Sequence, residues 1–433
     1  MKPRMFRDVA LSAMPIVFLL LMFLRYSPDW PYLDQWEFVP FLQKYAEGSL
    51  AWGDFWAQHN EHRIVLPRAV MLGCAVISHW DVRAELLVNL ILGVGIFGVW
   101  VRLAGVSVCN MPSLGILLSL LAFSLSQWQN WFLGWQLQEF MNVLSVCLSV
   151  LGLSRAEESR VAFAGAVLSA VAATYCFANG MVMWGAGALM LVCMRGANRK
   201  QFHAYLAVWT VAGAFSVGAY FWNYARPAYH PALSSAASHP MDFPLYVFEY
   251  LGQPLCNWSE YGAALVGLAG LAGWCVLLRV VAPKVRAAIW SPYLALGVYA
   301  VVSAAVTGVA RLDMGGTAQA MSSRYVTMAN LLWLSVIVLS ALWASAPSAT
   351  DAVRWRLNLS ATALAALLVV ASLYGAYRWT ERYHAMLPAR EALLQSNDLD
   401  LLGRLYPKPE VVVERREILR QYGLSLFKKR AER

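Results

Sequence analysis

The sequence predicts an all-α protein that crosses a membrane many times, and three observations lead to this fold class. Of its 433 residues, 59% are hydrophobic and only 14% are charged, whereas soluble domains carry about 25% charged residues. The mean hydropathy is +0.51. Apolar stretches of roughly 15–24 residues recur along the chain, close to the ~20 helical residues that cross a hydrocarbon core. Helices are expected because backbone groups in lipid must be hydrogen-bonded within the protein.

About eleven transmembrane helices are expected from these stretches. The first, residues 9–24, follows Lys2, Arg4 and Arg7 and resembles a signal peptide. No small-x-small cleavage site follows it, so we interpret it as an uncleaved span. The others are expected at residues 86–103, 111–126, 136–153, 161–175, 181–194, 205–224, 262–280, 289–310, 326–344 and 357–377.

The formal net charge of +9 indicates membrane orientation rather than nucleic-acid binding, because the basic residues are scattered over short loops and the tail. Cytoplasmic loops carry the excess of Lys and Arg. Basic residues cluster at 2–7, 195–200, 279–286 and 354–356. We therefore expect these segments, including the N-terminus, on the cytoplasmic side.

Counting spans back from residue 195 places the region near Asp81 outside the cell. With a cytoplasmic N-terminus, an odd number of spans must precede Asp81. Residues 9–24 already supply one span, so residues 64–78 do not cross the bilayer. That stretch is short and contains Pro67 and Arg68, which suits a helix lying at the interface. The first external loop then covers about residues 25–85.

The same count divides the chain into two parts. Residues 1–377 form a transmembrane domain, and residues 378–433 form a charged C-terminal tail. Leucine spacing in the tail predicts amphipathic helices. The tail falls on the external side.

The first external loop contains the residue types that transfer of a sugar to a hydroxyl requires. A carboxylate must accept the proton of the acceptor, a cation must stabilise the phosphate leaving group, and flat apolar faces must stack on the sugar. Asp34 and Glu37 are three residues apart, which places them on one face if the segment is helical, and they are the candidate catalytic carboxylates. Trp36 supplies an aromatic face, and Arg63 is a candidate for binding phosphate.

Each of these residues also has a structural interpretation. Trp and Tyr are generally enriched at membrane interfaces, and Asp34 or Asp54 could cap interfacial helices. The candidate substrate-binding residues in and near the loop are Trp36, Asp54, His59, Asn60, Glu61, His62 and Gln136.

A divalent cation, Mg²⁺ or Mn²⁺, is a possible cofactor because imidazole and carboxylate groups bind such ions. His59 and His62 could share a metal with Glu61 or Asp54, but His-Asn-Glu-His is not the His-Glu-x-x-His zinc pattern. Hydrogen bonding to the acceptor explains these residues better. The candidate metal ligands are Asp34, Glu37, His59 and His62.

Two further polar patches fall on the external side by the same count. They cover residues 127–139, including Gln136, and residues 311–324. Polar groups at the mouth of a span usually face a cavity. Arg324, with Tyr325 beside it, could bind the donor phosphate through a charge-assisted fork. The alternative is that Arg324 extends to the interface.

Asp-x-Trp-Glu directly after the first span, followed by Gln-His-Asn-Glu-His-Arg and an interfacial helix, resembles bacterial membrane proteins of the GT-C glycosyltransferase type. The architecture agrees throughout, while the sequence resemblance covers residues 32–68, 127–138 and 323–325. It implies a donor sugar on polyprenyl phosphate or diphosphate, and an acidic residue in the first external loop near the catalytic centre, which corresponds to Asp34. Many members have two adjacent acidic residues where this chain has Asp34-Gln35, so Glu37 is the second carboxylate or there is none.

We therefore expect an inverting glycosyltransferase of the bacterial inner membrane whose site faces the periplasm or exterior. It would move a sugar from a polyprenyl-(di)phosphate carrier to a hydroxyl of an extracytoplasmic glycan or lipid, with Asp34 as general base. Two alternatives are a flippase or transporter for a lipid-linked or small solute, and a noncatalytic subunit of a polysaccharide assembly complex. The enzyme interpretation fails if Asp34, Arg324 and residues 127–139 do not border one cavity.

Overall fold

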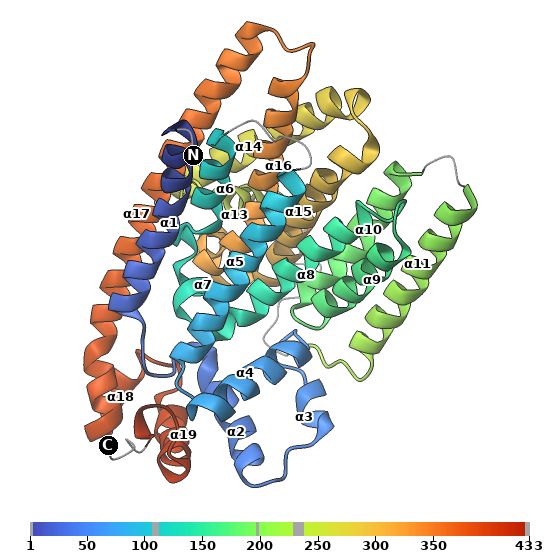
Figure 1. The fold of residues 1–433 in the computed structure, drawn as a ribbon. Coiled ribbons are helices and arrows are strands. Elements are labelled where there is room, and N and C mark those ends of the chain that lie inside the picture. The colour runs from blue at the N-terminus through green and yellow to red at the C-terminus, as the bar shows by residue number, and fades with distance from the viewer. Residues whose placement is uncertain (1–2, 106–111, 196–198, 228–237, 429–433) are drawn as a thin grey trace.

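The computed structural model describes residues 3–105, 112–195, 199–227 and 238–428. Throughout these ranges the secondary structure is helical and contains no β-strand; an isolated β-bridge pairs His59 with His62. The predicted all-α class is confirmed. Figure 1 shows long helices packed side by side, with shorter helices gathered at one end of the bundle.

Seven helical segments of the described chain are long and apolar enough to cross a membrane. They include α5, α8, α11, α14, α15, α16 and α17, and cover Arg83–Gly105, Gly134–Leu153, Arg199–Phe221, Glu260–Lys284, Ala287–Gly315, Ser323–Ser345 and Asp351–Gln395. Four other predicted spans coincide with helices whose apolar part is shorter: α1 (Pro3–Tyr26), α6 (Pro112–Ala122), α9 (Arg160–Thr174) and α10 (Val182–Cys193).

The centre of the bundle and its periphery differ in what their apolar side chains contact. In α16 (Val326–Ser345) most side chains from Val326 to Leu342 are buried. In α11 (Arg199–Phe221) large apolar side chains point outward, and Phe215 is 78% exposed. Large apolar surfaces of this kind mark a membrane or protein contact. The exposed face of α11 is therefore consistent with contact to lipid.

The first loop begins where α1 ends and returns to the bundle at α5 (Arg83–Gly105). Its helices are η1 (Leu33–Phe38), α2 (Val39–Ala46), α3 (Trp52–Trp56) and α4 (Val65–Ser78). All lie at the end of the bundle opposite the N-terminus (Figure 1). The predicted helix at 64–78 is thus present as α4, outside the parallel set of long helices.

The C-terminal part returns to the same end of the bundle. Helix α17 (Asp351–Gln395) continues without a break through the predicted boundary at residue 377. It is followed by α18 (Leu399–Leu402), α19 (Pro409–Tyr422) and η8 (Ser425–Phe427). In Figure 1, α18 and α19 lie beside the first loop. The loop and the tail therefore share one side of the molecule.

Candidate functional site

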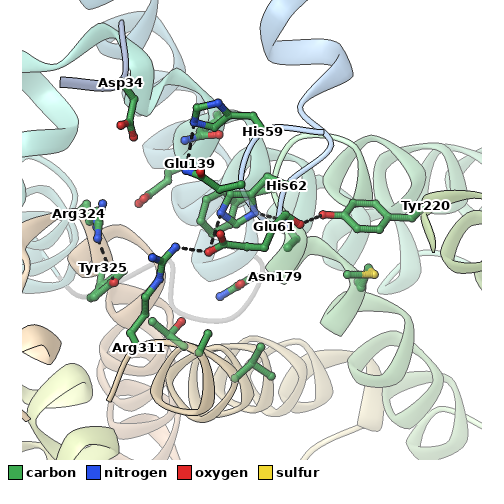
Figure 2. Close-up of a pocket in the computed structure, with 18 of the residues that line it drawn as sticks. Asp34, His59, Glu61, His62, Glu139, Asn179, Tyr220, Arg311, Arg324 and Tyr325 are labelled. Atoms are coloured by element: carbon green, nitrogen blue, oxygen red, sulfur yellow. Dashed lines mark hydrogen bonds and ion pairs between the residues drawn. The ribbon is translucent and has the colours of Figure 1, made fainter. Parts of the chain in front are cut away.

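A cavity of about 510 Å³ lies where the first loop meets the bundle (Figure 2). Its walls come from η1, the turn before α4, and the bundle helices α8, α11 and α15, together with the 3-10 helices η3 (Gly134–Gln136), η4 (Ala178–Met181) and η7 (Ser323–Tyr325). The cavity brings together Asp34, Arg324 and residues of the 127–139 patch, as the enzyme interpretation requires. The polar residues that line it include Asp34, His59, Asn60, Glu61, His62, Gln136, Gln138, Glu139, Asn179, Arg311, Arg324 and Tyr325.

Asp34 lies in the first turn of η1, and its side chain borders the cavity. The residue is partly exposed. Within the part of the chain that the structure describes, no hydrogen bond or ion pair reaches its carboxylate. A carboxylate that no protein group binds is available to accept a proton from a ligand.

A tight turn at residues 59–62 carries four of the predicted residues, His59, Asn60, Glu61 and His62, to the cavity. The backbone N–H groups of His59 and His62 each donate to the other's carbonyl oxygen over 2.8 Å. Asn60 adopts φ +48°, a left-handed conformation that Asn tolerates better than most residues. The turn is anchored to α11, because the Tyr220 hydroxyl donates to the Glu61 carbonyl oxygen over 2.7 Å.

The His59 ring packs against Trp135, with ring centroids 4.8 Å apart. Burial lowers the pKa of His59, although the negative charge of Asp34 acts in the opposite direction. The imidazole is therefore neutral at pH 7 and can both donate and accept hydrogen bonds. His59 suits contact with sugar hydroxyls better than contact with phosphate.

His62 and Glu61 form a fixed pair. The Nδ1 atom of His62 accepts a hydrogen bond from the Ala178 backbone N–H over 3.2 Å, so Nε2 carries the proton and faces Glu61 at 3.4 Å. Arg311 forms an ion pair with the same carboxylate. Burial raises the pKa of Glu61, but His62 and Arg311 outweigh burial and hold this pKa below its usual range. Glu61 therefore stays ionised.

Arg324 is a cation of the cavity wall with unused donors among the described residues. Its Nη2 atom donates to the Tyr325 hydroxyl over 3.4 Å, and the guanidinium lies 5.2 Å from the centre of that ring. Among the described residues, its Nε atom has no hydrogen-bond partner and no carboxylate forms an ion pair with it. The position beside the cavity agrees with the predicted phosphate-binding role.

Arg63, a predicted phosphate-binding residue, does not border the cavity. Its Nε, Nη1 and Nη2 atoms donate to the backbone carbonyl oxygens of Tyr220, Trp56 and Trp222 over 2.6, 2.7 and 2.6 Å. Buried carbonyl groups need such donors. Arg63 therefore joins the first loop to the end of α11.

Glu37 and Trp36 also lie outside the cavity lining, contrary to the sequence prediction. The Glu37 carboxylate lies 3.0 Å from Nη1 of Arg415 and accepts a hydrogen bond from the Tyr406 hydroxyl. Burial raises the pKa of Glu37, but these two hydrogen bonds outweigh burial and lower it. Trp36 is fully buried. Neither side chain is placed to contact a substrate in this cavity.

Asp54 has the capping role that was its alternative interpretation. Its carboxylate accepts the Ala51 backbone N–H over 2.9 Å and pairs with Lys44 at 2.5 Å. The hydrogen bond from Lys44 lowers the pKa of Asp54. Asp54 is not part of the cavity lining and stabilises the start of α3.

The structure adds a carboxylate of the polar patch 127–139 that was not among the predicted site residues. Glu139 is buried in α8 (Leu137–Leu153), lines the cavity and accepts a hydrogen bond from Nδ2 of Asn130 over 3.4 Å. The buried Oε1 atoms of Gln136 and Gln138 have no partner among the described residues. The polar patch 127–139 could be recognised in the sequence, but which of its side chains face the cavity could not. Tyr220 and Asn179 gave no signal at all.

The candidate metal ligands do not converge. In the described ranges, no group of three or more His, Cys, Asp or Glu side chains is arranged to hold a metal ion. Asp34, His59 and His62 border one cavity, whereas Glu37 is directed to the tail. The geometry gives no support for the possible Mg²⁺ or Mn²⁺ site.

Neither family models nor curated proteins nor solved structures match this chain.

Proposed function

We propose that this chain is a GT-C-type glycosyltransferase with eleven transmembrane helices that transfers a sugar from a polyprenyl-phosphate or polyprenyl-diphosphate carrier to a hydroxyl of an extracytoplasmic glycan or lipid. One observation carries the proposal. A carboxylate without a hydrogen-bond or ion-pair partner among the described residues, Asp34, and a guanidinium with unused donors there, Arg324, border the same cavity of about 510 Å³. Sugar transfer from a phosphate needs a base and a cation in this arrangement.

The proposed reaction is a single displacement with inversion. The acceptor oxygen forms a bond to the anomeric carbon, and the bond from that carbon to the carrier phosphate oxygen breaks. The electron pair leaves with the phosphate, where Arg324 stabilises the charge through N–H donors. Asp34 accepts the proton of the acceptor hydroxyl, so atoms and charge balance.

The remaining walls of the cavity suit the two parts of a lipid-linked sugar. His59, Gln136 and Gln138 offer hydrogen-bonding groups to sugar hydroxyls. Apolar residues of α11 and α15, among them Phe221 and Val306, line the cavity as well. These side chains suit the first isoprene units of the carrier, which would enter from the side between helices.

The proposed orientation follows from the loop charges. With a cytoplasmic N-terminus and eleven crossings, the first loop, the cavity and the tail all face the periplasm or exterior of a bacterial inner membrane. The loop and the tail lie at the same end of the bundle (Figure 1), which supports an odd number of crossings between the N-terminus and the tail.

A strain that lacks the chain tests the reaction class. We expect a polyprenyl-linked sugar to accumulate in the lipid extract, and one surface glycan or lipid to lose that sugar. The accumulated donor should lie in the outer leaflet, where a membrane-impermeant periodate reagent oxidises it in spheroplasts. A donor that accumulates out of reach of the reagent indicates a flippase. Unchanged lipid-linked sugars contradict the proposed donor.

A further inference from the structure

The C-terminal segment, residues 378–428, binds the first loop at the residues that flank Asp34. The backbone N–H of Leu33 donates to the Leu405 carbonyl oxygen over 2.8 Å. Three residues after Asp34, the Glu37 carboxylate pairs with Arg415 at 3.0 Å and accepts the Tyr406 hydroxyl. Contacts on both sides of the proposed base thus come from a segment about 370 positions later in the sequence.

Further bonds of the same segment hold the approach to η1. Arg382 donates from Nε and Nη2 to the Tyr32 hydroxyl over 2.9 and 2.6 Å. Arg390 forms a bidentate pair with Asp29, with distances of 2.7 and 2.6 Å. Bidentate guanidinium pairs fix orientation as well as distance. The whole stretch from Asp29 to Glu37 is therefore oriented by the C-terminal segment.

The backbone next to Asp34 needs such support. Leu33 has φ +49°, an unfavourable conformation for a residue with a branched side chain that persists only when its surroundings hold it. Short 3-10 helices also have weak internal hydrogen bonds. On the bundle side, the Gln35 side chain donates to Glu85 over 2.7 Å. On the outer side, Leu405 and Arg415 complete the support.

Charge is the second link between the tail and Asp34. Side chains three positions apart are aligned in a 3-10 helix, so Glu37 follows Asp34 one turn later. A bare carboxylate there would add a second negative charge near the proposed base. The positive charge of Arg415 compensates the charge of Glu37. Charged or titratable groups that interact with Asp34 include His59, Arg324 and Tyr406.

We propose that Leu405 and Arg415 of the C-terminal segment position the active site: Leu405 fixes the turn before Asp34, and Arg415 binds and neutralises Glu37, so that Asp34 faces the cavity. Arg415 and Glu37 are positioning residues that contact no substrate. This inference rests on the proposed role of Asp34 as the base.

The test is the pH dependence of the transfer rate. Full-length protein in detergent is supplied with the lipid extract of the deletion strain, and consumption of the lipid-linked sugar is followed between pH 4 and 8. In Arg415→Gln the uncompensated Glu37 charge moves the acidic limb of the rate profile to higher pH by about one unit. In Glu37→Gln the uncompensated Arg415 charge moves it to lower pH by about the same amount. The double variant returns the limb to the wild-type position.

The matched control is Lys428→Gln. It removes another ion pair between tail and loop, Lys428 with Asp81 at 2.5 Å, and leaves the profile unchanged. Arg415→Gln and Glu37→Gln shift in opposite directions, so either variant alone is informative if the other does not fold. An unshifted limb in a folded variant, with Asp34→Asn inactive, overturns this inference alone. An active Asp34→Asn protein instead overturns the proposed function.

Discussion

The cations that border the cavity differ in what already binds them. Arg311 is paired with Glu61, which His62 also contacts. Arg324 forms no ion pair within the described chain, and its Nε atom has no partner there. A cation that is not neutralised gives more stabilisation to a developing phosphate charge than a paired one. Arg324 and Arg311 should therefore respond differently to substitution.

Arg324→Gln should lower the transfer rate by about 10²–10³, the usual effect of removing one stabilising donor from an enzyme site. Arg324→Lys should recover part of the rate, because Lys restores the charge without the fork. The matched variant Arg311→Gln should mainly loosen the turn at residues 59–62, with a smaller rate loss. Consumption of the lipid-linked sugar at pH 7 measures all three. Equal losses for Arg311→Gln and Arg324→Gln would contradict a phosphate site at Arg324.

The helical segments could be predicted from the sequence, because apolar length alone locates them. Each predicted span overlaps a helix, and residues 64–78 form α4 as expected. The direction of individual side chains could not be predicted. Arg63 and Glu61 are two residues apart, yet Arg63 binds carbonyl oxygens of Trp56, Tyr220 and Trp222 while Glu61 borders the cavity. That outcome depends on α11, about 157 positions away.

Helix packing gives a prediction with an internal control. In α14 (Glu260–Val281), a Cβ at Gly267 would lie 1.9 Å from the Phe248 carbonyl oxygen of α13 (Asp242–Gly252), whereas a Cβ at Gly273 meets nothing within 4 Å. Gly267→Ala should separate the two helices and lower thermal stability in detergent. Gly273→Ala should be neutral or stabilise by about 0.5–1 kcal/mol. A Gly267→Ala protein as stable as the wild type would show that α13 and α14 do not pack this closely.

The site as a whole is assembled from most of the chain, since its lining runs from Asp34 to Tyr325 and its outer support reaches Arg415. From the sequence it could be predicted that Asp34, Arg324 and residues of the 127–139 patch border one cavity, because the loop charges placed their segments on the same side. The docking of the tail could not be predicted. Nothing in the sequence distinguishes Arg382, Arg390 and Arg415 from other basic residues, because their partners lie some 350–380 positions earlier.

The central claim is that Asp34 is the base of a sugar transfer, and Asp34→Asn in the deletion strain tests it most directly. The surface product and the lipid-linked sugar are quantified by mass spectrometry at wild-type expression, with Glu47→Gln, an exposed loop carboxylate outside the cavity, as matched control. Loss of a general base lowers rates by about 10²–10⁴. We therefore expect Asp34→Asn to accumulate donor and lack product like the deletion strain, while Glu47→Gln restores both. Full product with Asp34→Asn would contradict the account.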